Sequence, residues 1–217
     1  MLNGFWEIYD EIPYILSGVG VTLAYATVSV IFGFFVGVFI AMVKISRNRT
    51  IRLIGVCYTS IFRGTPLLLQ LFVIYFALPQ ILGIRISAFT AGVIAFSLNS
   101  SAYVSEIIRA GIGSVDHGQC EIAKVLGCSK LQVMMDIIFP QAIRNVLPSL
   151  VNEMIDLLKE SALVSIIGEA DLLRRANIVA SEHYLYLEPL LVAGACYYIL
   201  VMVLSALAKF VERKLSC

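Results

Sequence analysis

The chain has 217 residues, of which 59% are hydrophobic and only 14% are charged, and its mean hydropathy is +0.90. Soluble domains are about 45–50% apolar and about 25% charged, so a soluble core of this size cannot enclose so much apolar surface. The 16 Lys and Arg residues balance 15 Asp and Glu residues and leave a net charge of +1. This balance excludes a basic nucleic-acid-binding surface, and lipid is the expected solvent for most of the chain.

The cysteines and the amino terminus exclude two further classes of protein. Five cysteines are scattered without a Cys-x-x-Cys pair, which argues against a disulfide framework and predicts no metal site. The acidic amino terminus, with Glu7, Asp10 and Glu11, differs from the basic start of a cleaved signal peptide. We therefore expect the first apolar run to remain as a membrane anchor.

Long apolar runs predict an all-α polytopic membrane protein with about five transmembrane helices. Only helices and closed barrels satisfy the backbone in hydrocarbon, and these runs are too long for barrel strands. The fourth run carries Arg144, Glu153 and Asp156 and contains two prolines, as expected of a helix that faces protein or water. In chain order the five predicted spans are residues 12–43, about 53–84, 86–105, 137–158 and 189–208.

The distribution of Lys and Arg predicts the orientation of these spans, because basic residues accumulate on the cytoplasmic side. With the amino terminus outside and the carboxyl terminus in the cytoplasm, eleven basic residues flank the inner ends of the spans and four flank the outer ends. The four outer residues are Arg85, Lys159, Arg174 and Arg175. The short apolar piece 161–168 cannot cross, so it is either a re-entrant or gating segment or an interfacial helix.

Residues 110–136 form the largest predicted cytoplasmic element, and about 27 residues are too few to build a core of their own. The pattern predicts two short helices, with Gly127 breaking the first and Ser129 capping the second. The apolar residues of this loop need a cover, either the ends of the spans or a separate protein. They include Ile122, Val125, Leu126, Leu131, Val133 and Met134.

A motif in this loop resembles a known family. Five residues follow the spacing E-x-A-x3-G-x9-I-x2-P, namely Glu121, Ala123, Gly127, Ile137 and Pro140. This spacing is similar to the EAA loop of the membrane subunits of binding-protein-dependent ABC importers. Ile122 and Phe139 depart from the usual Ala and Leu of that loop, and both keep the position apolar.

Further stretches resemble the polar amino-acid permease branch of the same family and extend the likeness to about residues 12–215. These stretches are Arg63-Gly64-Thr65-Pro66, Leu69-Gln70, Leu126-Gly127-Cys128-Ser129, Pro140-Gln141-Ala142-Ile143-Arg144, Leu147-Pro148, Asn152-Glu153 and Leu158-Lys159-Glu160-Ser161.

The resemblance implies one transmembrane permease domain over residues 1–217, in the inner or plasma membrane of a prokaryote. It also implies three kinds of partner: a cytoplasmic ABC ATPase, a second permease subunit that is identical or closely related, and an external solute-binding protein. The expected ATPase-coupling residues are Glu121, Ile122, Ala123, Val125, Leu126 and Gly127. An amphipathic helix resting on lipid is the alternative interpretation of this segment.

Polar residues inside the runs are the candidates for a solute path. Glu153 and Asp156 are one helical turn apart and share a face, so they either line a cavity or are satisfied locally, Asp156 by Lys159. Asn99, Tyr103 and Glu106 share a face of the third run. The expected path residues are Glu153, Asp156, Asn99, Tyr103 and Asn152.

Two carboxylates favour a cation, so a basic amino acid (arginine, lysine or histidine) is the first expected solute and glutamine the second. The sequence leaves the roles of Arg63 and Glu106 open. Arg63 either pairs with an acid inside the bundle or marks the inner mouth of the second span. Glu106 either lines the path or lies at the inner interface.

Motifs for chemistry are absent from the sequence. It contains no Walker-type Gly-x4-Gly-Lys-Ser/Thr run and no His-Glu-x-x-His, and neither His117 nor His183 lies within a predicted span. We therefore expect no cofactor and no enzymatic activity in the chain itself. A gradient-driven carrier or channel without an ATPase partner is the alternative function, and an intramembrane enzyme is a third that the missing groups disfavour.

Overall fold

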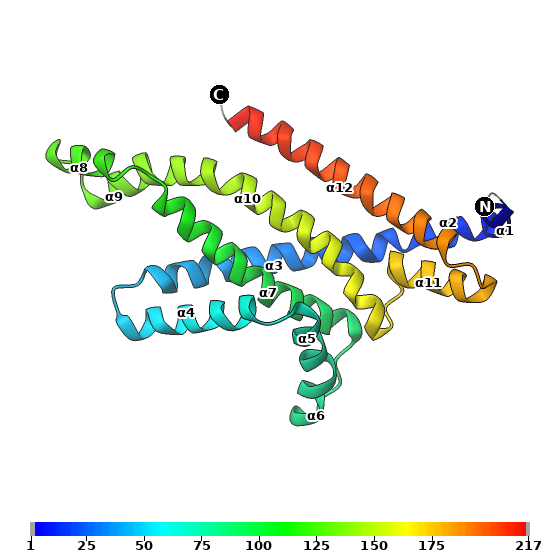
Figure 1. Ribbon diagram of the computed structural model, residues 1–217. Helices are drawn as coiled ribbons and strands as arrows, with labels where there is room; N and C mark the ends of the chain where they lie inside the picture. Colours follow the sequence, from blue (N-terminus) through cyan, green and yellow to red (C-terminus); the bar gives the residue numbers. More distant parts are fainter. Residues whose placement is uncertain (1–2, 216–217) are drawn as a thin grey trace.

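The computed structural model describes residues 3–215, and this part of the chain is helical without strands (Figure 1). Its ends lie at opposite ends of a bundle of long helices. The helices are α1 (Asn3–Glu7), α2 (Ile12–Ser17), α3 (Val19–Ile45), α4 (Arg49–Gly64), α5 (Leu67–Phe72), α6 (Leu78–Leu82), α7 (Ala88–Gly113), α8 (His117–Val125), α9 (Lys130–Gln132), α10 (Phe139–Glu160), α11 (Leu172–His183) and α12 (Leu187–Leu215). Tighter or wider turns join some of them, the 3-10 helices Tyr9–Glu11 and Ser161–Ile167 and the π-helices Val73–Ala77 and Val133–Ile138.

Three helical segments within residues 3–215 are long and apolar enough to cross a bilayer: Tyr9–Ile45, Ala88–Gly113 and Leu187–Phe210. They coincide with the first, third and fifth predicted spans. A bent pair of helices supplies a fourth, Arg49–Gly64 with Leu67–Leu82. Helix α10 corresponds to the remaining predicted span. It has too many charged residues to count among the helices that are apolar enough to cross a bilayer, so a crossing by α10 stays a prediction.

The second predicted span is sharply bent rather than continuous. The two halves meet at an angle of 103°, and α5 and α6 project sideways from the bundle in Figure 1. The bend falls at Pro66, which has no N–H to offer to the carbonyl of Phe62 four residues earlier. The proline therefore ends α4, and the apolar run continues in a new direction.

Small residues bring α3 and α7 into close contact at the centre of the bundle. Ser29, Gly33, Gly37 and Ala41 recur every fourth residue on α3, and all four are buried. A Cβ atom at Gly37 would lie 2.7 Å from Cβ of Val104 on α7. The close approach of α3 and α7 therefore requires residues with little or no side chain at this crossing.

The 3-10 turn Ser161–Ile167 is part of the core and not an interfacial helix. Val164 and Ile167 belong to the same buried cluster as Tyr25, Leu71 and Phe96. The turn ends at Gly168, whose φ of +93° lies in the left-handed region that glycine adopts most readily. A second buried cluster joins the first helices to α11 and α12: Ile8, Ile15, Leu172, Ala176, Val179 and Ala193.

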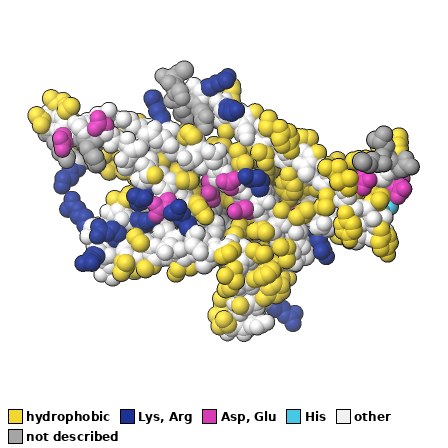
Figure 2. Space-filling view, in the orientation of Figure 1, with side chains coloured by type: hydrophobic (Ala, Val, Ile, Leu, Met, Phe, Trp, Pro, Cys, Tyr) yellow, Lys and Arg dark blue, Asp and Glu magenta, His cyan; other side chains and the backbone are white. Residues whose placement is uncertain are grey.

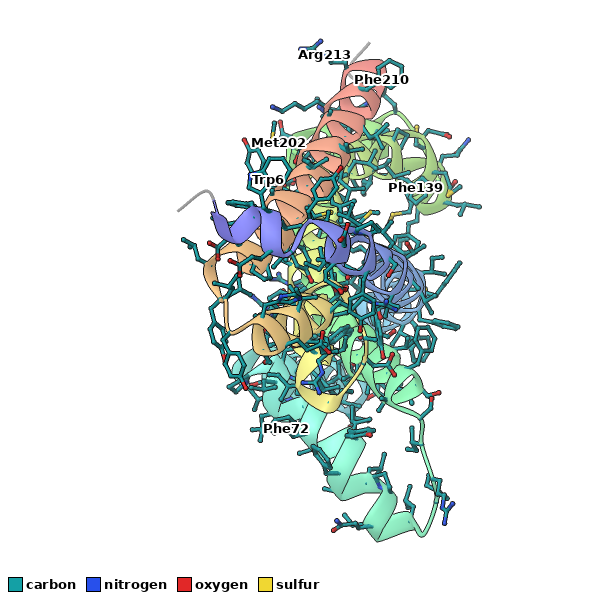
Figure 3. The ribbon with its side chains drawn as sticks, turned by 90° about the vertical axis from the view of Figure 1, so that its right-hand side faces the viewer. Trp6, Phe72, Phe139, Met202, Phe210 and Arg213 are labelled. Atoms are coloured by element: carbon teal, nitrogen blue, oxygen red, sulfur yellow. The ribbon has the colours of Figure 1, made fainter. Side chains whose placement is uncertain are left out.

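Large apolar side chains cover much of the outer surface. Figure 2 shows them in yellow along the bundle and over the projecting α5 and α6. Phe139 and Met202 lie at the edge of the bundle in Figure 3 and are each about half exposed. Such a surface suits hydrocarbon and not water, in agreement with the composition.

Candidate functional site

A cavity of about 500 Å³ opens between α7, α10 and the 3-10 turn that follows α10. Asn99 and Tyr103 line it from α7, and Glu153 and Asp156 line it from α10. Four of the five expected path residues thus come together. The fifth, Asn152, is exposed on α10 and does not line the cavity. The remaining lining residues are Lys159, Glu160, Ala162 and Leu163.

The charges of this cavity are predominantly negative. Its lining carries three carboxylates and one ammonium group. Asp156 pairs with Lys159, whose Nζ lies 2.6 Å from Oδ1. Among the described residues, neither Glu153 nor Glu160 has a basic partner within ion-pair distance. Figure 2 shows this acidic group with its single basic neighbour near the middle of the molecule.

Glu160 is a member that the sequence analysis missed. It lies one turn beyond Asp156 and two turns beyond Glu153, so all three acids share a face of α10. Extending the i, i+3 spacing of Glu153 and Asp156 to i+7 would have found it.

Asn99 also holds the bend between α4 and α5. Its Nδ2 donates to the carbonyl of Phe62 at 3.0 Å and to Oε1 of Gln70 at 3.0 Å. Gln70 Nε2 donates to the same carbonyl at 2.8 Å and to the carbonyl of Thr65 at 3.1 Å. These amides replace the N–H that Pro66 lacks, because a buried carbonyl needs a donor. Asn99 thus connects the cavity wall to the bend.

Glu106 is the centre of an ion-pair cluster that joins three helices. One oxygen accepts from Nζ of Lys44, which is buried on α3 and also donates to Oγ1 of Thr59 at 3.1 Å. The other oxygen pairs with Arg109 at 2.8 Å. Arg63 lies further away, with Nη1 3.9 Å from Oε1 of Glu106. Both residues whose roles the sequence left open therefore meet in one cluster.

The predicted coupling loop folds as two short helices, α8 and α9. Gly127 ends α8 with a φ of +83°, and the N–H of Cys128 returns to the carbonyl of Ala123 at 3.0 Å. Ser129 and Gln132 form a reciprocal capping box at the start of α9. The expected turn and cap are thus both present.

The expected coupling residues divide into two groups. Ile122, Val125 and Leu126 are 63%, 87% and 76% exposed. Ala123 is buried, in the helix that packs against the turn Val133–Ile138, and so it offers no outward surface. Glu121 and Gly127 are exposed beside the apolar group. Of the neighbouring residues, the side chains of Cys120 and Lys124 lie outside the described part of the structure.

Replacing Gly127 by alanine is expected to destabilise the α8 turn by about 1–2 kcal/mol, the cost of a side chain in the left-handed region. Nothing lies within 4 Å of the added Cβ, so the effect comes from the backbone alone. Limited proteolysis of the loop measures it, and faster cleavage at α8 is the expected result. Gly113→Ala is the matched control, since it lies in α7 with equal space around it; equal cleavage of both variants contradicts the assignment.

Two pairs of polar side chains fix the loop to α10, and the sequence analysis did not find them. Nε2 of Gln141 donates to Oε1 of Gln119 at 2.6 Å, and Nδ2 of Asn145 donates to the hydroxyl of Ser114 at 2.8 Å. The partners are 22 and 31 residues apart, so no local pattern marks them. Movement of α8 is thereby linked to the helix that carries Glu153.

Comparison with known proteins decides the family. Residues 29–216 match the binding-protein-dependent transport system inner membrane component. The chain belongs to this family. It is therefore a multi-pass permease subunit of the bacterial inner membrane and is not itself an enzyme.

Individual relatives match over nearly the whole permease. A putative glutamine transport system permease of Rickettsia conorii is 55% identical over 209 residues, which cover 96% of each chain. The arginine transport system permease of Bacillus subtilis is 51% identical over 98% of this chain and 97% of its own. A crystal structure of an amino acid ABC transporter with histidines is 47% identical, with a TM-score of 0.92, covering 97% of this chain and 98% of that one.

Proposed function

We propose that the permease forms the membrane path of an ATP-driven importer of polar amino acids. The observation that carries this proposal is the cavity between α7 and α10, whose lining has two more carboxylates than ammonium groups. Carboxylates at membrane depth are costly and mark polar paths. The names of the relatives, which transport glutamine or arginine, and the histidines of the related structure agree with such a solute.

A basic amino acid is the first choice of solute and glutamine the second. Asp156 is already paired with Lys159, which leaves Glu153 and Glu160 to attract a cation. The side chain of glutamine has no net charge, so the two carboxylates attract it less strongly.

We also propose the coupling and the orientation. Ile122, Val125 and Leu126 would dock into a groove of a cytoplasmic ABC ATPase, since an apolar group so exposed needs a protein or lipid cover. The amino terminus would lie outside. Lys and Arg side chains gather near the junction of α3 and α4 in Figure 2, the end where α8 lies, as the inner side requires.

Partners complete the importer: a second permease subunit, identical or closely related, and an external solute-binding protein at the α11 end. Arg174 is exposed there and can contact such a protein. Asp171 is buried and caps α11, accepting from the N–H of Arg174 at 2.9 Å, and burial raises the pKa of its carboxyl. Asp171 therefore has a structural role and offers no docking surface.

Glu153→Gln tests the solute site, because it removes the charge and keeps the shape. In the purified complex with its ATPase, retention of labelled arginine is expected to weaken roughly 10- to 100-fold, as when a bond to a charged group is lost. Equilibrium binding in detergent measures it, with labelled glutamine in parallel.

Glu182→Gln serves as the control, since Glu182 is an exposed carboxylate on α11 and does not line the cavity. Undiminished arginine retention by Glu153→Gln would reject the cavity as the solute site. A weaker effect on arginine than on glutamine would reverse the order of the two solutes.

A further inference from the structure

The groove between α7 and α10 contains a second cavity besides the one described above. This second cavity has a volume of about 620 Å³ and lies nearer the coupling loop. Its lining comes from the same two helices and the residue after α7: Glu106, Ile107, Ala110 and Gly111 on α7, then Ser114, with Asn145 and Ser149 on α10. We refer to the cavity with Glu153 as the outer cavity and to this one as the inner cavity.

The two cavities follow one another along a single face of each helix. On α7, Asn99 and Tyr103 line the outer cavity, and Glu106 and Ala110 continue the same face into the inner cavity. On α10, Ser149 precedes Glu153 by four residues and so lies one turn closer to the loop. A solute that leaves the outer cavity along this groove therefore meets the inner cavity next.

Arg63 approaches one lining residue of each cavity. Its guanidinium carbon is 5.3 Å from the centre of the Tyr103 ring, which lines the outer cavity. Its Nη1 is 3.9 Å from Oε1 of Glu106, which lines the inner cavity. Tyr103 and Glu106 are one turn apart on α7, so one side chain from α4 reaches a lining residue of both cavities.

We propose that Arg63, resting on Tyr103 and oriented by Glu106, is a gate that separates the outer cavity from the inner one. The inference rests on the proposed function, in which a solute passes along this groove. A guanidinium beside the path repels other cations, as basic residues do in selective pores. A cationic amino acid therefore passes only when Arg63 moves off the ring.

The partners of Arg63 allow such a movement, whereas those of Glu106 do not. The Arg63 side chain is 44% exposed, and it makes one long ion pair and one ring contact. Glu106 is fixed on both oxygens, by buried Lys44 and by Arg109. Glu106 thus acts as the fixed partner, and Arg63 is the part that can swing.

The position of Arg63 also connects the gate to the solute. It belongs to the last turn of α4, directly before the bend at Pro66. Asn99 and Gln70 hold the carbonyls of that bend, and Asn99 lines the outer cavity. A solute that contacts Asn99 can therefore shift the bend after α4, and with it the last turn of α4, which carries Arg63.

The test measures leakage through the complete importer, with its ATPase, in proteoliposomes without ATP. Vesicles are loaded with labelled arginine, and its efflux is followed for Arg63→Gln and for Tyr103→Leu, two variants that remove the contact from opposite sides. Each is expected to raise efflux at least about fivefold. The double variant is expected to leak no more than the faster single variant, because both remove one interaction.

Arg109→Gln is the matched control, since Arg109 pairs with Glu106 but contacts neither Tyr103 nor either cavity. Its efflux is expected to equal that of the unchanged importer. Equal leakage from Arg63→Gln and Arg109→Gln would overturn the gate, because it would report only a loosened Glu106 cluster. Unchanged efflux in both gate variants would overturn it as well.

Failure of the proposed function gives a different result. If Glu153→Gln still retains arginine in detergent, the solute site is rejected, and the efflux of the Arg63 and Tyr103 variants still decides the gate. If Glu153→Gln loses arginine and the gate variants do not leak, the solute site stands and the gate is rejected.

Discussion

A carboxylate on the exposed face of α8, as in Val125→Asp, is expected to detach the ATPase and to stop ATP-driven uptake. Val125 is the most exposed of the apolar residues that we propose for coupling. Transferring an ion from water into an apolar interface costs several kcal/mol, and about 4 kcal/mol weakens binding on the order of 1000-fold. The fold of the permease is expected to survive, because Val125 makes few contacts within the chain. Co-purification of the ATPase from membranes, together with uptake in vesicles, measures both effects.

Thr50→Asp is the matched control for this variant. Thr50 is exposed in the first turn of α4, where a carboxylate is favourable near the helix amino terminus, and α4 begins on the α8 side of the bundle. It is expected to keep both the ATPase and the uptake. If Val125→Asp retains the ATPase, the docking assignment fails. If uptake continues without ATP, the gradient-driven carrier becomes the better account.

The fold of the proposed coupling loop was predictable because its signals are local. The left-handed turn at Gly127 and the capping box at Ser129 each depend on residues within five positions, and both are present. The inward orientation of Ala123 was not predictable in the same way. It depends on packing against the segment before α10, which the spacing of the motif does not report.

Hydropathy did not predict the sharp bend after α4. The apolar run continues through Pro66, so composition indicates one helix, and Pro66 alone indicates only a kink or an end. The angle of 103° depends on donors from Gln70 and Asn99. Asn99 is 37 residues from the carbonyl that it satisfies, and no pattern along the chain links the two.

Helical periodicity predicted which residues line the outer cavity, but it did not predict the contacts of those residues with other helices. Helical spacing placed Glu153 with Asp156 and Asn99 with Tyr103, and all four line one cavity. The contact of Arg63 with Tyr103 joins α4 to α7 across 40 residues of sequence. Such a contact follows only from how the helices cross, which in turn depends on small residues such as Gly37.

Another close contact, at the junction of α2 and α3, carries the second large prediction. Gly18→Ala is expected to destabilise the permease by about 3 kcal/mol, because it overpacks a site with no room to yield. An added Cβ would lie 2.6 Å from the backbone N of Leu172 and 2.7 Å from its Cα. These are backbone atoms at the start of α11, and the N–H of Leu172 also donates to Thr22 at 3.3 Å. A backbone so held cannot move aside as a flexible side chain does.

Gly20→Ala, two residues further along, separates this steric effect from the general effect of replacing glycine. Nothing lies within 4 Å of its Cβ, and inside α3 alanine is the better helix former by up to about 1 kcal/mol. Gly20→Ala is therefore expected to be neutral or stabilising, and Gly18→Ala strongly destabilising, in reversible unfolding from mixed micelles. Equal stabilities of the two variants would show that α11 is not held against Gly18. The end of the permease that carries α11 would then be free to shift relative to α3, and the proposal that α11 is a fixed platform for a solute-binding protein would fail.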